Sequence, residues 1–171
     1  GFYRCSKQAA ELFIEEFNRR YDLDFTVLRY GSLYGNRADE SNSIKRFLLQ
    51  GLREGKIVYP GTGDEMREYI HIKDAAKLSV DIISPEYKNK HIVITGHHPM
   101  KSREMLEMIA EILKNDVKLE FLGSSDNSHY TLTPYSFTPK IGSKLVSNLY
   151  IDMGQGLLEC LQEISQELDR S

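Results

Sequence analysis

Helix-like and strand-like patterns of apolar residues alternate along the first third of the chain. Residues 6–21 carry apolar side chains at helical spacing with Glu and Arg opposite, which predicts an amphipathic helix. The run DFTVLRY at 24–30 is rich in β-branched and aromatic residues and predicts a buried strand. A Gly/Asn/Ser-rich loop, 31–43, follows, and its last residues 41–43 can cap a helix that extends to about residue 54. The apolar positions of the first helix are Ala9, Ala10, Leu12, Phe13, Ile14 and Phe17.

The alternation continues through the middle of the chain. KIVYPGTGDEMREYIHI at 56–72 predicts two short strands around a Gly-rich turn, and Asp74 is expected to cap a helix over about 75–83. KHIVITG at 90–96 predicts another strand. Ser102 is expected to cap a strongly periodic helix that continues to Leu113.

The last third is less regular. VKLEFLG at 117–123 predicts a strand, whereas 124–150 is polar and aromatic with weak periodicity and is expected to form a long loop or arm. A final amphipathic helix is predicted over about 157–168. Alternating helices and strands indicate an α/β fold. Because the strands are few and the first element is a helix, we expect an open sheet that lacks its first strands.

Composition excludes several classes of function. The 171 residues suffice for one domain, or one domain and an arm. A net charge of -3 and a pI near 6.0 argue against a nucleic-acid or anionic-membrane partner. Cys5 and Cys160 lie far apart and predict no disulfide framework; Cys5 is expected to be a small buried side chain. No apolar run could span a bilayer and no signal pattern is present, so a cytoplasmic location is predicted.

Tyr3 and Lys7 form the first candidate catalytic pair. Residues four apart lie on one helical face, about 5–6 Å apart at Cβ. The Lys ammonium would lower the pKa of the Tyr hydroxyl, which could then exchange a proton with a substrate hydroxyl. The alternative is chance, because both residue types are common on helix surfaces.

Other candidate sites have weaker patterns. PGTGDEM at 60–66 lacks the third Gly and the preceding strand of a dinucleotide-binding turn. His97 and His98 have no Cys or carboxylate at ligand spacing, so no metal site is predicted. His71 is expected to be a packed or hydrogen-bonded residue and not a base.

Four motifs in order resemble a known family. Tyr3-x-x-x-Lys7 is followed by LRYGSLYGNR at 28–37, GTGDEMREYIHIKDAA at 61–76, and HIVITG before a helix. Together they resemble the extended short-chain dehydrogenase/reductase family, specifically its NAD-dependent nucleotide-sugar epimerases and dehydratases, well over 1–115 and loosely beyond. The resemblance implies the C-terminal portion of a Rossmann-type fold with a small α/β substrate-binding domain. Residues 1–35 would end the dinucleotide-binding domain, and 36–171 would mainly form the substrate-binding domain.

The resemblance also implies the catalytic and cofactor-binding residues. Tyr3 would be the acid/base, and Lys7 would lower its pKa and hydrogen-bond the nicotinamide ribose. Tyr30 and Leu33 would face the nicotinamide of NAD or NADP. In the complete enzyme a hydride would pass from a sugar carbon to the nicotinamide while Tyr3 takes the hydroxyl proton. The ketosugar would then be epimerised, dehydrated or reduced.

A second group of residues would bind a nucleotide-diphosphate sugar. Arg67 would grip the diphosphate, although its spacing equally permits a surface ion pair with Glu65 or Glu68. Ser32 stands where the family usually has Asn, which leaves its sugar contact open, and Asn36 stands where it usually has Pro. The full set implied for substrate binding is Ser32, Asn42, Ser43, Val58, Pro60 and Arg67.

The C-terminal third departs from the family pattern. The usual Arg-Pro-x-Asp segment is replaced by YTLTPYSFTPKIGSKL at 130–145, where Lys140 or Lys144 could substitute for the Arg. The identity of the sugar and the nucleotide therefore stays open.

Features expected of a complete enzyme have no counterpart in the sequence. The Gly-rich turn and the acidic ribose ligand of a Rossmann half are absent, as is a Ser or Thr upstream of Tyr3. We therefore expect a C-terminal part that is inactive alone, with an unpaired sheet edge, and that belongs to a homodimer when full length. Two alternatives remain: a reductase of the same superfamily acting on a non-nucleotide substrate, and a non-catalytic binding module that retains the fold.

Overall fold

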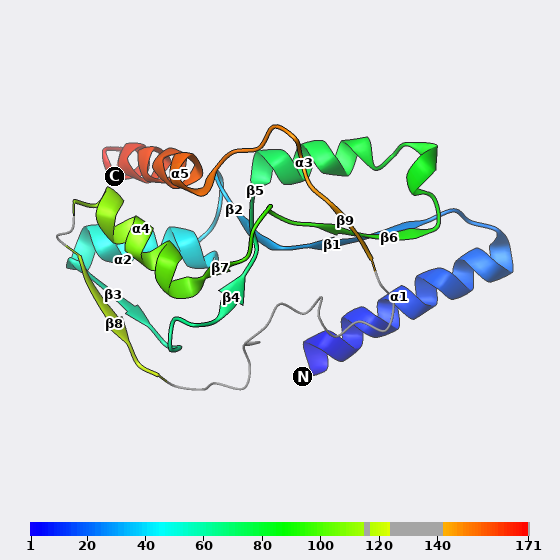
Figure 1. Cartoon of the computed structure of the whole chain (residues 1–171), viewed down its shortest axis with the longest axis horizontal. Helices are drawn as coiled ribbons and strands as arrows, with labels where there is room; N and C mark the ends of the chain where they lie inside the picture. Colours follow the sequence, from blue (N-terminus) through cyan, green and yellow to red (C-terminus); the bar gives the residue numbers. More distant parts are fainter. Residues whose placement is uncertain (115–116, 124–141, 171) are drawn as a thin grey trace.

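The computed structural model describes residues 1–114, 117–123 and 142–170. Two groups of elements are visible along its long axis (Figure 1). The helices are α1 (Phe2–Tyr21), α2 (Ser43–Glu54), α3 (Ile72–Asp81), α4 (Ser102–Ile112) and α5 (Met153–Leu168), with a 3-10 turn η1 at Pro85–Tyr87. The strands are β1 (Thr26–Tyr30), β2 (Ser32–Tyr34), β3 (Lys56–Tyr59), β4 (Met66–Arg67), β5 (Tyr69–His71), β6 (Lys90–Ile94), β7 (Met100–Lys101), β8 (Lys118–Phe121) and β9 (Ser143–Leu145).

The largest sheet is parallel and has the strand order β1-β6-β9. Its first two strands pair in the register Thr26↔Lys90 to Tyr30↔Ile94. Within the described residues β1 is an edge strand, in agreement with the predicted unpaired edge. The mixed helix and strand order confirms the α/β class predicted from the sequence.

The expectation of two strands around a turn at 56–72 is wrong. Three strands form there, and each pairs with a distant partner: β3 with β8 and β5 with β2 in parallel, and β4 with β7 antiparallel. The Gly-rich turn is instead closed by Glu65, whose carboxylate accepts hydrogen bonds from the backbone N–H of Thr62 and Gly63 at 2.9 Å each. Those bonds lower the pKa of Glu65 although burial alone would raise it.

Apolar packing forms two separate cores. The larger one joins α2, α4 and α5 to β3 and β8, and Leu48, Leu106 and Leu157 in it are fully buried. The smaller core packs α3 against the parallel sheet through Leu78 and Ile92. Since side chains alternate across a strand, His91 next to Ile92 points to the other face of the sheet, where α1 lies (Figure 1).

Three helix starts differ from the sequence prediction. His71, and not Asp74, caps α3: its Nδ1 accepts from the N–H of Lys73 at 3.3 Å. Asp74 sits inside the first turn and accepts from the N–H of Ile151 at 2.9 Å. The N-cap residue of α4 is Lys101 instead of Ser102, and the last helix begins at Met153, earlier than predicted.

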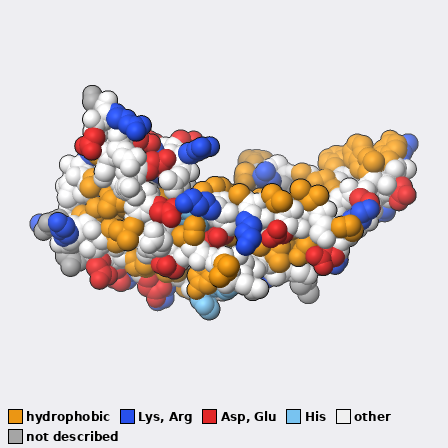
Figure 2. Space-filling view, turned by 90° about the horizontal axis from the view of Figure 1, so that it is seen from above, with side chains coloured by type: hydrophobic (Ala, Val, Ile, Leu, Met, Phe, Trp, Pro, Cys, Tyr) orange, Lys and Arg blue, Asp and Glu red, His pale blue; other side chains and the backbone are white. Residues whose placement is uncertain are grey.

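The outer face of α1 also departs from a simple amphipathic arrangement. The predicted helix is confirmed, but Glu15 is its buried residue, whereas Phe13 and Phe17 are 69% and 53% exposed. Hydrophobic side chains gather at the end of the molecule that α1 and Tyr21 occupy (Figure 2). The apolar stripe thus faces outward because polar contacts hold the opposite side of the helix against the sheet.

The two cysteines and the expected C-terminal arm can also be compared with the structure. Cys5 is exposed and not buried as expected, since it lies on a side of α1 that no other described element covers, while Cys160 is buried in the larger core. Burial raises the pKa of the Cys160 thiol to about 11. Of the expected long arm, 124–141 lies outside the described residues, and the remainder contains β9. Among the described helices, none has the length and apolarity needed to cross a membrane.

Candidate functional site

Tyr3 and Lys7 lie one turn apart at the start of α1, as the sequence predicts. The Lys7 Nζ is 5.4 Å from the centre of the Tyr3 ring, a cation–π distance. The Tyr3 side chain is 74% exposed. The pair is therefore preformed on one helical face and open to a ligand.

The segment after β1 is fixed in place by backbone contacts. Gly31 N–H donates to the Ile94 carbonyl, and Ser32 N–H donates to the Glu68 carbonyl, both at 2.8 Å. A Cβ atom at Gly31 would lie 2.6 Å from that Glu68 oxygen, so only glycine permits this approach. Ser32 and Leu33 are thereby held beside the strand pair β2–β5.

Tyr30 and Leu33 have only partly exposed side chains. Each is 37% exposed. The Tyr30 hydroxyl lies 2.6 Å from the Ser79 hydroxyl of α3, which places the polar end of this residue against the helix. Tyr30, at the end of β1, and Leu33, in β2, thus each present a partly exposed side chain.

Asn42 is used mainly as the N-cap of α2. Its Oδ1 accepts from the N–H groups of Ile44 and Lys45 at 3.1 and 3.3 Å, and its Nδ2 donates to the Leu33 carbonyl at 2.9 Å. Two of the N–H groups that a helix start offers to an anion are thus already bonded. Ser43 beside it is exposed and is the freer of these two predicted residues.

A cavity of about 340 Å³ lies beside α2 and Val58, and its charged lining consists of Arg46 and Arg53 together with Glu40 and Glu54. The Val58 N–H is bonded to the Gln50 side-chain oxygen at 3.1 Å. Sequence reasoning identified Val58 but missed Gln50 and the two arginines of the cavity, Arg46 and Arg53. Their spacing of four and three residues puts all three on one face of α2, which is the signal that could have found them.

Arg67 lies on β4 between two partly buried tyrosines. Its charge opposes, but does not overcome, the rise that burial causes in the pKa of Tyr59 and of Tyr69, the latter reaching about 12. One guanidinium nitrogen donates to the Met66 carbonyl at 2.9 Å. Of the two carboxylates considered as surface partners, Glu65 closes the turn described above, and Glu68 pairs with Lys144 at 3.0 Å.

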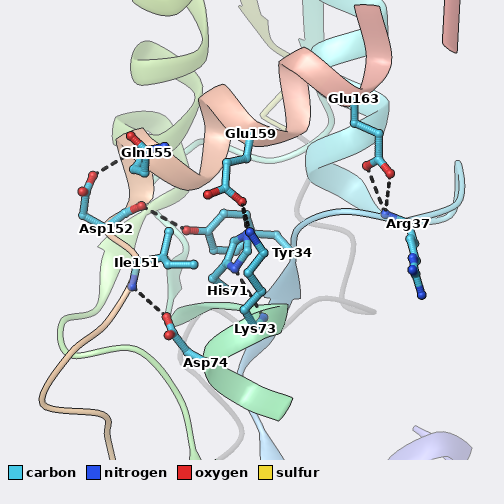
Figure 3. A network of polar contacts seen from close by, with 10 residues as sticks. All are labelled: Tyr34, Arg37, His71, Lys73, Asp74, Ile151, Asp152, Gln155, Glu159 and Glu163. Atoms are coloured by element: carbon cyan, nitrogen blue, oxygen red, sulfur yellow. Dashed lines mark hydrogen bonds and ion pairs between the residues drawn. The ribbon is translucent and has the colours of Figure 1, made fainter. Parts of the chain in front are cut away.

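The C-terminal helix is tied to the strands behind this site (Figure 3). Glu159 of α5 accepts from Lys73 at 2.7 Å, which lowers the pKa of that carboxyl group. The buried His71 ring lies 3.7 Å from the same carboxylate, and burial lowers the pKa of the imidazole. Both contacts come from residues at the junction of β5 and α3, so α5 braces the strand that pairs with β2.

The predicted residues therefore fall into two groups. Ser32, Leu33 and Asn42 are joined by hydrogen bonds or strand pairing, and Arg67 lies two residues before β5 in the adjoining strand. Tyr3 and Lys7 are on α1, which within the described residues contacts the sheet through Arg29 and His91 on the face opposite α3.

Comparisons with known proteins place the chain in a family. A model described as the NAD dependent epimerase/dehydratase family matches residues 1–95. The chain is 27% identical over 120 residues to UDP-glucuronate 4-epimerase of Thermodesulfobacterium geofontis, covering 70% of this chain and 37% of that protein. It is 22% identical over 118 residues to dTDP-glucose 4,6-dehydratase 1 of Escherichia coli, covering 69% and 33%.

Solved structures share the fold over nearly the whole chain. The UDP-glucuronic acid 4-epimerase of Bacillus cereus, in complex with UDP-glucuronic acid and NAD, aligns with a TM-score of 0.78 at 18% identity and covers 96% of this chain and 52% of that one. The UDP-glucose 4-epimerase of Thermotoga maritima with UDP-glucose aligns with a TM-score of 0.73 at 18% identity, covering 96% and 53%. The chain thus spans about half the length of these structures and about a third of the curated relatives. The Rossmann-like α/β fold is confirmed, and the chain belongs to the NAD-dependent epimerase/dehydratase family.

Proposed function

We propose that this chain is the catalytic-Tyr and substrate-binding part of an NAD(P)-dependent nucleotide-sugar epimerase or dehydratase. The observation that carries the proposal is the Tyr3–Lys7 pair, which stands preformed and open at the start of α1 in a chain of this family. The short-chain fold and the nucleotide-sugar complexes of its neighbours support the same conclusion.

The residues present fit the nicotinamide end of the cofactor. A phenol and an ammonium side by side can hydrogen-bond ribose hydroxyls, while the half-exposed Tyr30 ring and Leu33 offer an apolar surface to a ring. NAD or NADP, when bound, supplies the two-electron acceptor for the sugar carbon. The choice between the two dinucleotides depends on groups at the adenosine end, for which the described residues suggest no ligand.

The chain's own part in the reaction is proton transfer and orientation. Tyr3 Oη accepts the proton of the sugar hydroxyl as its carbon becomes a carbonyl, and returns it in the reverse step. Lys7 stabilises the phenolate and holds the ribose. Ser32, whose backbone N–H is bonded to the Glu68 carbonyl, would contact the sugar through its hydroxyl. A general acid/base of this type contributes about a hundredfold to ten-thousandfold in rate.

The proposed substrate is a nucleoside-diphosphate sugar. Arg67 has the forked guanidinium that suits a diphosphate. Val58 lines the cavity beside α2, and Pro60, directly after β3, and Ser43, at the start of α2, would border the nucleotide with it. The sugar and the base are not assigned.

The proposal includes the state of the whole protein. Because most of the cofactor's contacts have no counterpart in these residues, the isolated chain is expected to be inactive.

The exposed apolar face of α1, with Phe13, Phe17 and Tyr21, is proposed to pair with a second copy in a homodimer. Light scattering of the full-length protein would give a dimer mass, and Phe13→Glu with Phe17→Glu would give a monomer. A cytoplasmic location stays a prediction.

The experiment is binding and turnover of UDP- and dTDP-sugars by the full-length protein that contains this chain. Arg67→Ala should weaken nucleotide-sugar binding by about tenfold to a hundredfold, the loss expected for charge-assisted hydrogen bonds. Lys88→Ala, which removes an exposed cation paired with Asp24, is the matched control and should bind normally. Unchanged binding in Arg67→Ala would favour a reductase that acts on a non-nucleotide substrate. Substrate binding without turnover in the wild type would favour a non-catalytic module.

A further inference from the structure

The helix that carries Tyr3 and Lys7 is attached to the sheet by charged and polar groups. Tyr3, Lys7, Glu11 and Glu15 follow one another at four-residue steps. Their side chains therefore lie along one ridge of α1, about 6 Å apart along the helix axis at each step. The Arg29 guanidinium of β1 grips Glu11 with two bonds, Nε to Oε1 at 2.8 Å and Nη2 to Oε2 at 2.5 Å.

A second contact one turn further on repeats this attachment. His91 Nε2 of β6 lies 3.0 Å from Glu15 Oε1. With Nε2 donating to Glu15, the His91 Nδ1 accepts from Arg29 Nη2 at 3.4 Å, so one neutral tautomer satisfies both ring nitrogens. Only 10% of the Arg29 side chain and 11% of those of His91 and Glu15 are exposed. The network is thus largely shielded from water and strongly directional.

Apolar packing does not fix the same helix within the described residues. Its large apolar side chains, such as Phe13 and Phe17, are more than half exposed on the opposite side. Apolar contacts tolerate sliding, whereas a bidentate Arg–carboxylate pair specifies both distance and angle. Within the described part of the chain, Glu11, Arg29, Glu15 and His91 therefore supply the most directional contacts that orient α1, and Asn18 near its end adds a bond to Asn89.

We propose that Glu11, Arg29, Glu15 and His91 are positioning residues that set the register of the Tyr3–Lys7 pair against the loop at the end of β1. This inference rests on the proposed catalytic role of Tyr3. The strands that hold the network are the same ones whose C-terminal ends carry Gly31 and its partner Ile94. A displacement of the helix by about 1 Å can reduce a reaction rate by about a hundredfold. Substrate binding, which we place on β2, α2, β3 and β4 and not on α1, does not depend on this register.

The decisive test separates position from stability in the full-length, cofactor-loaded protein. The double variant Glu11→Leu with Arg29→Met replaces the ion pair by apolar groups of similar length, a change that often preserves stability. We expect an unfolding temperature close to that of the wild type, a KM for the nucleotide sugar within about twofold, and a kcat lowered by about tenfold or more. A well-folded double variant with unchanged kcat would overturn the proposal.

A second pair of variants keeps the test sharp if the double variant does not fold. His91→Gln retains an N–H donor toward Glu15 and should recover most of the kcat that His91→Leu loses, a rescue that a purely structural cavity effect would not give. Equal kcat in these two variants would contradict the proposal.

Two control variants complete the design. Glu16→Ala, which breaks an exposed pair with Arg19 at 3.1 Å on the same helix, should leave kcat unchanged, and an equal loss there would argue against a specific register. Tyr3→Phe measured in parallel distinguishes the two levels of inference. If Tyr3→Phe is inactive while the network variants have normal kcat, only the positioning role of the network is refuted. If Tyr3→Phe is active, the proposed function is refuted as well.

Discussion

Replacing Asn42 by alanine tests whether this residue serves the fold or the substrate. The side chain makes three hydrogen bonds, two as the N-cap of α2 and one to the carbonyl of Leu33 in the middle of β2. The change removes all three. It also leaves the N–H groups of Ile44 and Lys45 without their side-chain acceptor.

The expected loss of stability follows from these contacts. Removing an Asn N-cap costs about 1 kcal/mol, within a range of about 0.5–2. The single bond from Nδ2 to the Leu33 carbonyl contributes about 0.5–1.5 kcal/mol net. The free energy of unfolding should therefore fall by about 2 kcal/mol in Asn42→Ala. Asn42→Ser, which can still cap the helix but cannot reach Leu33, should lose about half as much.

Urea unfolding monitored by circular dichroism measures these differences, with an unchanged m-value as the check that the unfolded state is the same. Ser43→Ala is the matched control, since Ser43 is exposed at the neighbouring position, and it should stay within about 0.5 kcal/mol of the wild type. A loss below about 0.5 kcal/mol in Asn42→Ala, or an equal loss in Ser43→Ala, would refute the assignment of Asn42 as a structural cap.

Three further predictions concern the supporting structure. Burial lowers the pKa of His71 below its usual 6.5, so the unfolded chain binds more protons in acid and the protein loses stability as the pH falls below about 6.5. His71→Asn keeps a cap for α3 but does not titrate, so it should flatten this pH dependence of stability in denaturant titrations between about pH 7 and 5. An unchanged slope would contradict this prediction. Gly156→Ala should destabilise the protein by about 1–3 kcal/mol in thermal unfolding, because the added Cβ would lie 2.5 Å from the Tyr34 hydroxyl; a stabilised variant would show that α5 can move away. Leu106→Ala in the larger core should cost about 2–5 kcal/mol, against about 0.5 or less for the half-exposed Leu158→Ala, and similar costs would mean that the core is wrongly located.

Local signals in the sequence predicted most elements correctly. The helix of α2 was predicted with its capping region and its end at about Glu54, because a polar cap, an apolar face and a following Gly occur in sequence there. Strand pairing was not predictable in the same way. The partner of β3 is β8, about sixty residues later, and no local pattern records which distant strand completes a pair.

The burial of α1 shows a second limit. Its apolar spacing identified a helix, but no local pattern showed which side of it meets the sheet, since the contacts that orient it come from Arg29 and His91 in distant strands. The Tyr3–Lys7 pair could be predicted from the sequence, because a spacing of four residues on a helix already places both side chains on one face. The spacing of Arg46 and Arg53 places them on one face of α2, but it does not show that a cavity lies beside that face.

The central claim is that Tyr3 exchanges the substrate's proton, and Tyr3→Phe tests it most directly. The measurement is turnover of a nucleotide sugar by the full-length protein, alongside the affinities for NAD and for that sugar. We expect the affinity for the sugar to change little, because the Arg67 region is retained, and the affinity for NAD to fall by no more than about tenfold, because one hydrogen bond to the ribose is lost while Lys7 stays. The kcat should fall by about a hundredfold or more. A Tyr3→Phe enzyme that keeps kcat within a few-fold of the wild type would contradict it.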